Sequence, residues 1–158
     1  MKLTDRAAFV IGTWFGCGES KIAPGTVGSI GAVPLHLVLR RLPLALHWAA
    51  IVVLSLVGIW ASDRVARVLG VKDPQRVVVD EVAGTLIAMG MVRDLGPYVA
   101  AAALVLFRFF DIVKPGPIGR AEHAEPPGLG IMLDDLVAGA CAGAVTRLGA
   151  LAIAWALA

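Results

Sequence analysis

The sequence predicts an all-α protein, a polytopic helical bundle with about four to five membrane helices and a short N-terminal helix. Of its 158 residues, 58% are hydrophobic, and the mean hydropathy is +0.82. Soluble domains are typically about 45–50% apolar. The apolar residues also gather in uncharged runs, and most charges lie between the runs. The length fits one compact membrane domain, residues 1–158.

The N-terminal part contains short elements. Residues 3–12 predict a short helix, and residues 12–29 form a loop that contains five glycines. Residues 28–39 are apolar but include Pro34 and His36. At about 1.5 Å per residue, this run is too short to cross a hydrocarbon core of about 30 Å unaided. We therefore expect a partial, tilted or earlier-starting helix here.

Residues 44–61 are the clearest membrane helix in the sequence. The run carries no charge, and Trp48 and Trp60 lie near its ends, where interfacial tryptophans are expected. Residues 62–80 are polar. The first part of this segment predicts a helical extension, and Asp73-Pro74 predicts a break.

Three further helices are expected in the second half. Residues 82–92 and 98–110 are apolar and are separated by a turn at 93–97. A polar loop rich in proline and glycine covers 119–130, and residues 133–158 form a long final helix. Small residues in its first half, such as Gly139 and Gly143, favour close helix contacts.

If the runs 28–39, 44–61, 82–92, 98–110 and 133–158 all cross the membrane, the long loops fall on one side. These loops carry most of the lysines and arginines: Lys2, Arg6, Lys21, Arg64, Arg67, Lys72, Arg76, Lys114 and Arg120. The other side holds Arg40, Arg41 and Arg93. The positive-inside rule therefore predicts that the loop-rich side faces the cytoplasm.

Carboxylates gather on that same side, where they predict a metal site. The five residues are Asp80, Glu81, Asp111, Asp134 and Asp135. Charged side chains near lipid are costly unless they are paired, hydrated or metal-bound. Hard divalent cations such as Mg²⁺ prefer oxygen ligands. The alternative is that the two acidic pairs are helix N-caps, since both precede apolar runs.

The residues expected to bind phosphate lie on the same side. The cations Arg108, Lys114 and Lys21 are candidates, although Arg108 also has the spacing for a plain ion pair with Asp111. The loop at Gly25, Thr26 and Ser29 opens a helix, and such loops bind anions through hydroxyls and backbone amides. A plain helix start is the alternative for this loop.

The histidines and cysteines give less information about the site than the acids and cations do. His123 lies in a polar loop, where it is either a proton-transfer group or a solvated side chain. His36 and His47 fall on the other side of the membrane and are expected to be structural. Cys17 and Cys141 form no CxxC pair, so we expect neither a disulfide framework nor a zinc site.

Four sequence blocks together resemble the phosphatidylglycerophosphatase A family of bacterial membrane phosphatases. The blocks are KIAPGTVGS (21–29), VVDEVAG (78–84), FRFFDIVKPGPI (107–118) and GLGIMLDDLVAG (128–139). One departure is that Pro126-Pro127 stands where family members often have Gly-Gly.

The resemblance implies a Mg²⁺-dependent hydrolase in the bacterial cytoplasmic (inner) membrane. Its substrate would be phosphatidylglycerophosphate, and its products phosphatidylglycerol and inorganic phosphate. A phospholipid is thus the expected partner, and no nucleic acid is expected. We expect Asp80, Glu81, Asp134 and Asp135 to hold the metal. The expected catalytic groups are Asp80, Asp111, Lys114 and Arg108.

Alternatives remain open at this point. The attacking group is either water or an aspartate such as Asp80 or Asp111. Another metal-dependent phospholipid phosphatase or phosphotransferase is the next candidate, but the DG…AR…G…D…D pattern of CDP-alcohol phosphotransferases is absent. A small ion transporter is a weaker alternative, because the acids gather on one face.

Overall fold

The computed structural model describes residues 2–121 and 124–157, with the side chains of all of these except Pro117 and Arg120. In this part of the chain every regular element is a helix, which confirms the all-α prediction. The elements are α1 (Leu3–Gly12), the 3₁₀ turn η1 (Cys17–Glu19), α2 (Pro24–Gly31), α3 (Val33–Leu39), α4 (Leu44–Leu69), α5 (Val79–Gly90), α6 (Pro97–Val113), α7 (Pro117–Ala121) and α8 (Pro127–Ala156).

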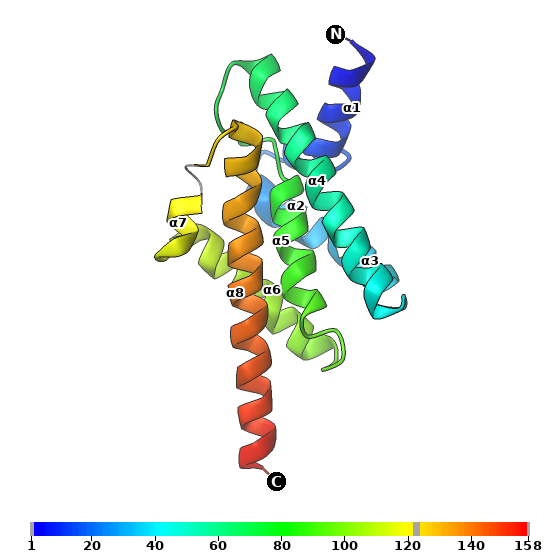
Figure 1. Ribbon diagram of the computed structural model, residues 1–158, viewed down its shortest axis with the longest axis vertical. Helices are drawn as coiled ribbons and strands as arrows, with labels where there is room; N and C mark the ends of the chain where they lie inside the picture. The colour runs from blue at the N-terminus through cyan, green and yellow to red at the C-terminus, as the bar shows by residue number, and fades with distance from the viewer. Residues whose placement is uncertain (1, 122–123, 158) are drawn as a thin grey trace.

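Helix α8 is the axis of the bundle (Figure 1). Its first half packs against α4, α5 and α6, and its second half continues beyond the other helices to the C-terminus. The contact with α5 is close because two glycines meet there. A Cβ atom on Gly139 would collide with the Gly84 carbonyl, and one on Gly84 would meet the Phe107 ring and the Asp135 carbonyl oxygen. These glycines therefore set the distance between α5 and α8.

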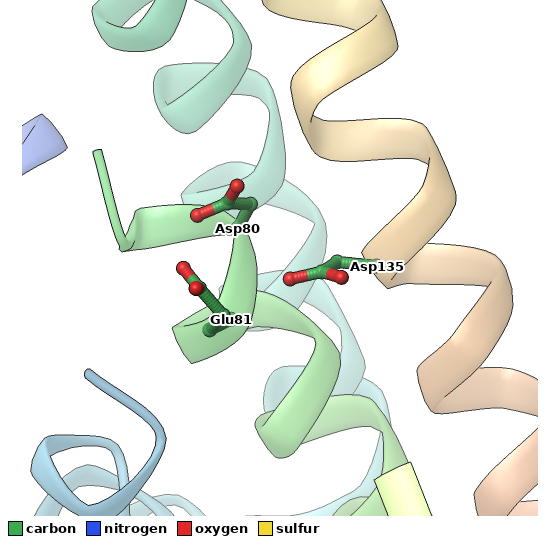
Figure 2. Close-up of side chains that lie close together, drawn as sticks. All are labelled: Asp80, Glu81 and Asp135. Carbon is green, nitrogen blue, oxygen red and sulfur yellow. The ribbon is translucent and has the colours of Figure 1, made fainter. Parts of the chain in front are cut away.

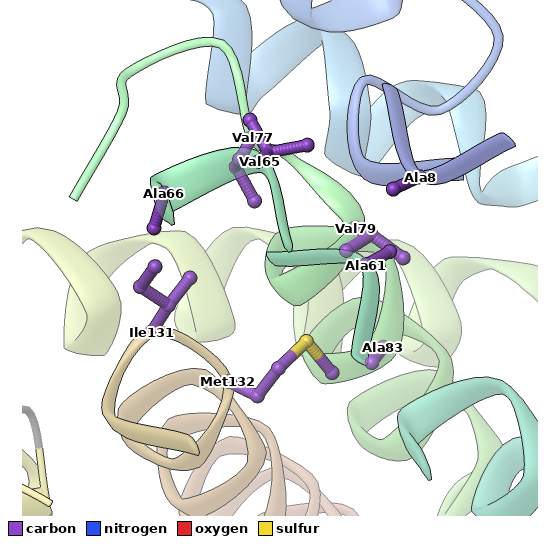
Figure 3. Close-up of a cluster of buried hydrophobic side chains, with 9 residues drawn as sticks. All are labelled: Ala8, Ala61, Val65, Ala66, Val77, Val79, Ala83, Ile131 and Met132. Carbon is purple, nitrogen blue, oxygen red and sulfur yellow. The ribbon is translucent and has the colours of Figure 1, made fainter. Parts of the chain in front are cut away.

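A cluster of buried apolar side chains joins four helices at the end of the bundle that carries the site (Figure 3). Val65 of α4, Val79 of α5 and Met132 of α8 are fully buried in it, and Ala8 brings in α1. Outside this cluster, Asp5 of α1 binds Arg64 of α4 at 2.7 Å. The hydrogen bond from Arg64 lowers the pKa of the Asp5 carboxyl. The N-terminal helix is thus fixed to α4 by apolar and ionic contacts.

Several helix boundaries differ from the sequence prediction. The apolar run 28–39 is two helices, α2 and α3, which meet at Ala32. Pro34 lies in the first turn of α3, where its missing N–H costs nothing. The final helix begins at Pro127 rather than 133. Asp134 and Asp135 are therefore two turns inside α8, and the N-cap interpretation is wrong for this pair.

Among the described residues, two helices, α4 and α8, are long and apolar enough to cross a membrane. This weakly suggests that the protein is associated with a membrane. The segment Pro24–Leu39 is apolar but shorter. With 12 residues, α5 is about 18 Å long, so it falls well short of a bilayer core. Many large apolar side chains face outward, including Leu56 of α4 and Leu148 of α8.

Candidate active site

Three carboxylates converge where α5 begins beside α8. Asp80 and Glu81 lie in the first turn of α5, and Asp135 of α8 points toward them (Figure 2). One carboxylate oxygen from each residue lies within 4.8 Å of the other two. Asp80 Oδ1, Glu81 Oε2 and Asp135 Oδ2 are buried and make no hydrogen bond to any described residue. Three carboxylates so close together, each with a buried oxygen that lacks a hydrogen bond, call for a cation.

The surrounding sequence fixes the start of α5. Val78 and Val79 are fully buried, and the Val78 N–H donates to the Gly12 carbonyl at 2.8 Å. A Cβ atom on Gly28 would approach Val78 Cβ to 2.8 Å, so α2 lies tightly against this segment. The apolar residues thus hold the backbone, and the two acids that follow line the pocket.

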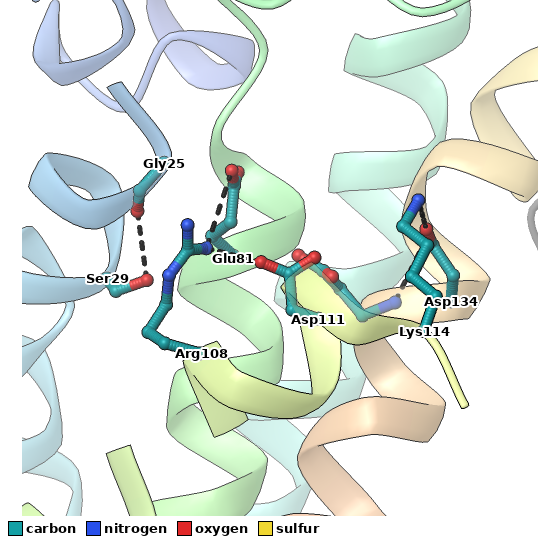
Figure 4. A network of polar contacts seen from close by, with 8 residues as sticks. Gly25, Ser29, Glu81, Arg108, Asp111, Lys114 and Asp134 are labelled. Carbon is teal, nitrogen blue, oxygen red and sulfur yellow. Dashed lines mark hydrogen bonds and ion pairs between the residues drawn. The ribbon is translucent and has the colours of Figure 1, made fainter. Parts of the chain in front are cut away.

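Helix α6 brings cationic groups to the carboxylates (Figure 4). Arg108 binds Asp111 at 2.6 Å and lies 3.7 Å from Glu81. Lys114, directly after α6, binds Asp134 at 2.7 Å. Asp134 therefore faces Lys114, whereas its neighbour Asp135 faces Asp80 and Glu81. Adjacent residues of a helix point in different directions. Asp135 can therefore belong to the carboxylate cluster while Asp134 pairs with a lysine.

The glycine-rich loop contributes one predicted phosphate-binding residue to the site. Gly25 lines the pocket, and a Cβ atom there would collide with Glu81 Oε1 and approach Arg108 Nη2 to 3.1 Å. The Ser29 hydroxyl instead donates to the Gly25 carbonyl at 2.9 Å and is buried. Thr26 is exposed outside the pocket lining, and Lys21 lines a neighbouring hollow beside Arg76. Ser29, Thr26 and Lys21 thus do not line this pocket.

These groups line a cavity of about 510 Å³. It also contains residues that the sequence did not single out as site residues: Lys72, Asp73, Gln75, Val77, Pro127 and Ile131. For Lys72, Asp73, Gln75 and Val77, the sequence offered one indication: they belong to the polar segment 62–80, which was predicted to lie on the same side as the acids. His123 lies outside the described residues.

Two pocket-lining residues have strained backbones. Ala23 and Lys114 both have φ of 46°, in the left-handed region, and both line the cavity. Such conformations cost about 1–3 kcal/mol in residues other than glycine and gather at functional sites. At Lys114 this conformation ends α6. The residue whose ammonium binds Asp134 thus has a strained backbone.

The arrangement suits phosphate chemistry with a hard metal ion. The clustered carboxylate oxygens are the ligand type that Mg²⁺ prefers. Arg108 and Lys114 offer positive charge to phosphate oxygens at the same cavity. Residues 10–150 match the family described as phosphatidylglycerophosphatase A. The chain belongs to the phosphatidylglycerophosphatase A family.

Membership of the phosphatidylglycerophosphatase A family is supported by individual relatives. Phosphatidylglycerophosphatase A of Escherichia coli is 35% identical over 125 residues, which is 79% of this chain and 73% of that protein. The Haemophilus influenzae protein of the same name is 35% identical over 127 residues, covering 78% of this chain and 77% of its own. A Bacteroides thetaiotaomicron protein named putative phosphatidylinositol-3-phosphatase is 40% identical over 146 residues, covering 88% and 91%. No solved structure matches the chain.

The region matched to the phosphatidylglycerophosphatase A family includes every residue of the pocket. The resemblance inferred from the four sequence blocks is therefore confirmed, and so is the prediction of an enzyme of this family.

Proposed function

We propose that the chain is a Mg²⁺-dependent lipid phosphatase that hydrolyses phosphatidylglycerophosphate to phosphatidylglycerol and inorganic phosphate. The observation that carries this proposal is the cluster of Asp80, Glu81 and Asp135, with its unpaired oxygens, in a pocket that also holds Arg108 and Lys114. Family membership supplies the reaction.

The carboxylate cluster fits a divalent metal ion. Each of Asp80, Glu81 and Asp135 has one buried oxygen without a hydrogen bond in the described structure. These three residues would hold Mg²⁺, and Asp134 would support the site through Lys114 rather than as a ligand. Bound there, Mg²⁺ would supply positive charge against the phosphate oxygens.

The protein's own cations would orient the phosphate. The Arg108 guanidinium is held by Asp111 and Glu81, and the Lys114 ammonium by Asp134. Both are therefore preorganised on the wall of the cavity, where they can stabilise charge that develops on the phosphate oxygens. Asp111 acts here as a positioning residue for Arg108.

We further propose the multi-pass arrangement that the apolar runs predict, in a bacterial inner membrane. In this arrangement α2–α3, α4, α6 and α8 cross. Helix α5, about 18 Å long, runs inside the bundle from the recessed pocket to the turn before α6, and the pocket faces the cytoplasm. The excess of lysine and arginine in the loops that flank the pocket supports this orientation. A phospholipid headgroup would then lie level with the carboxylates.

The Bacteroides relative favours a second candidate substrate, a phosphoinositide, because it is the more identical of the relatives compared above. Both candidate substrates carry a phosphomonoester on a polar headgroup, and in both a phosphodiester links that headgroup to diacylglycerol. The same pocket chemistry serves either lipid. The identity of the headgroup is therefore a question for direct assay.

The test is phosphate release by the purified protein in detergent micelles. The two lipids are phosphatidylglycerophosphate and phosphatidylinositol 3-phosphate, each assayed with Mg²⁺ and with excess EDTA. We expect release from phosphatidylglycerophosphate that EDTA abolishes and that added Mg²⁺ restores. Release that persists in EDTA would contradict the metal. Faster release from the phosphoinositide would assign the second candidate, and no release from either lipid would overturn the function.

A further inference from the structure

The pocket has an inner part and an exposed mouth. Asp134 and Asp135 are buried, and the side chains of Glu81, Arg108 and Asp111 keep less than a fifth of their surface exposed. The mouth includes Lys72, Asp73 and Gln75, all exposed residues of the segment between α4 and α5, and the exposed Ala23. Lys72, Asp73 and Gln75 are therefore within reach of a ligand in the pocket and of solvent.

The three cations among the pocket residues are held in different ways. Arg108 and Lys114 bind carboxylates at 2.6 and 2.7 Å, and their side chains are 17% and 31% exposed. The Lys72 side chain is 60% exposed, and it contacts Glu125, itself 67% exposed, at 3.3 Å. Exposed ion pairs of this kind contribute little. Lys72 can therefore exchange Glu125 for an anion on a ligand at low cost.

The proposed function gives such a ligand a second negative charge. Phosphatidylglycerophosphate carries a phosphomonoester at one end of a glycerol unit and a phosphodiester at the other. With the monoester between the carboxylate cluster and Arg108, the diester would lie toward the exposed side of the pocket, which Lys72 lines. A lysine ammonium on a long flexible stem suits the single charge of a diester.

Resting on the proposed function, we propose that Lys72 binds the phosphodiester of the lipid substrate and so selects headgroups that carry two phosphates. The monoester is recognised by the inner part of the pocket, and the diester by the mouth. Phosphatidylglycerol, the lipid product, retains only the phosphodiester, which Lys72 binds. Inorganic phosphate resembles only the monoester, which the inner part of the pocket binds.

These two products separate the two halves of the pocket in one experiment. Phosphatidylglycerophosphate hydrolysis is measured in mixed micelles for the wild type and for Lys72→Gln, with phosphatidylglycerol or inorganic phosphate as the inhibitor. In the variant we expect KM and the inhibition constant of phosphatidylglycerol to rise about tenfold. The inhibition constant of inorganic phosphate and kcat should stay within about twofold.

Two further variants complete the design. Lys72→Arg keeps the charge and should restore most of the affinity for phosphatidylglycerol. Arg67→Gln removes one exposed cation of α4 that pairs with Asp63 outside the pocket, and it should leave both inhibition constants unchanged. A comparable change in Arg67→Gln would mean that Lys72 acts only through the charge of the surface.

The outcomes separate this inference from the proposed function. An active wild type with an unaltered Lys72→Gln variant would overturn the role of Lys72 and leave the function intact. Equal weakening of phosphatidylglycerol and inorganic phosphate would also overturn it, because the lysine would then not distinguish the diester. A wild type that releases no phosphate from this lipid would overturn the function itself.

Discussion

Helix α5 has buried polar groups at both of its ends. At its start, Asp80 and Glu81 meet Asp135. At its end, Gly90 packs against His47, which lies beside His36 with ring centroids 6.4 Å apart. Both histidines are buried, and all four of their ring nitrogens lack hydrogen bonds in the described structure. By burial and unpaired polar atoms alone, the two ends look alike.

The two ends of α5 differ in the charge of their polar groups and in whether those groups line the cavity. The carboxylates line a cavity of about 510 Å³ together with cationic side chains, whereas neither histidine lines that cavity. Trp48 stacks edge-on against His47 at 5.4 Å, and Gly90 covers its Nε2. A neutral imidazole can stay buried without a counter-ion, but clustered carboxylates cannot. Burial of polar groups therefore does not identify a site unless charge and an open cavity accompany it.

The largest expected effect comes from removing one charge of the carboxylate cluster. Asp135→Asn keeps the shape of the side chain but replaces one anionic oxygen with an amide. We expect kcat for phosphate release to fall on the order of 10³-fold, because the proposed metal ion would lose one of its anionic ligands. The thermal midpoint in detergent should stay within about 3 °C, since one uncompensated charge is removed.

The matched control makes the same chemical change near the other end of α5. Asp94→Asn alters an exposed acid that pairs with Arg147 at 2.8 Å, and it should keep activity within about twofold, as expected for a surface ion pair. If Asp135→Asn retained more than a tenth of wild-type activity, the carboxylate cluster would not be the catalytic centre.

A smaller effect is expected from a methyl group added at the pocket wall. In Gly25→Ala the new Cβ atom collides with Glu81 Oε1 and presses on Arg108. Displacing the Glu81 carboxylate should cut kcat about 10–100-fold and raise the Mg²⁺ concentration needed for half-maximal rate. Gly149→Ala in α8 meets nothing within 4 Å and should preserve both values. Unchanged Mg²⁺ dependence in Gly25→Ala would show that Glu81 is not a ligand.

The smallest effect on activity is expected from the equivalent change at the other end of α5. In Gly90→Ala the Cβ atom would lie 2.7 Å from His47 Nε2, which overpacks the contact between α5 and α4. We expect a loss of stability of about 1–3 kcal/mol, read as a lower thermal midpoint in detergent. The kcat of the folded enzyme should not change. A large loss of kcat with an unchanged midpoint would mean that the two ends of α5 are functionally coupled.

Much of the site followed from residue types and spacing. The acids at 80, 81, 111, 134 and 135 all line one pocket, with Arg108, Lys114 and Gly25 beside them. Ser29 does not line it, because its hydroxyl donates to the carbonyl four residues earlier, and Thr26 is exposed elsewhere on α2. Lys72 was missed as a site residue because nothing in a polar loop indicates which of its charges will line a cavity.

The sequence by itself determined the helical class, the family and the side of the bundle on which the acids gather. Apolar runs and motif blocks are local patterns, so they could be read without coordinates. Only the tertiary structure decided that Asp135 faces Asp80 and Glu81 while Asp134 faces Lys114. That division depends on how α8 is rotated against α5, which the close contact of Gly84 and Gly139 fixes. Helix rotation is a property of packing, and no single segment of the chain encodes it.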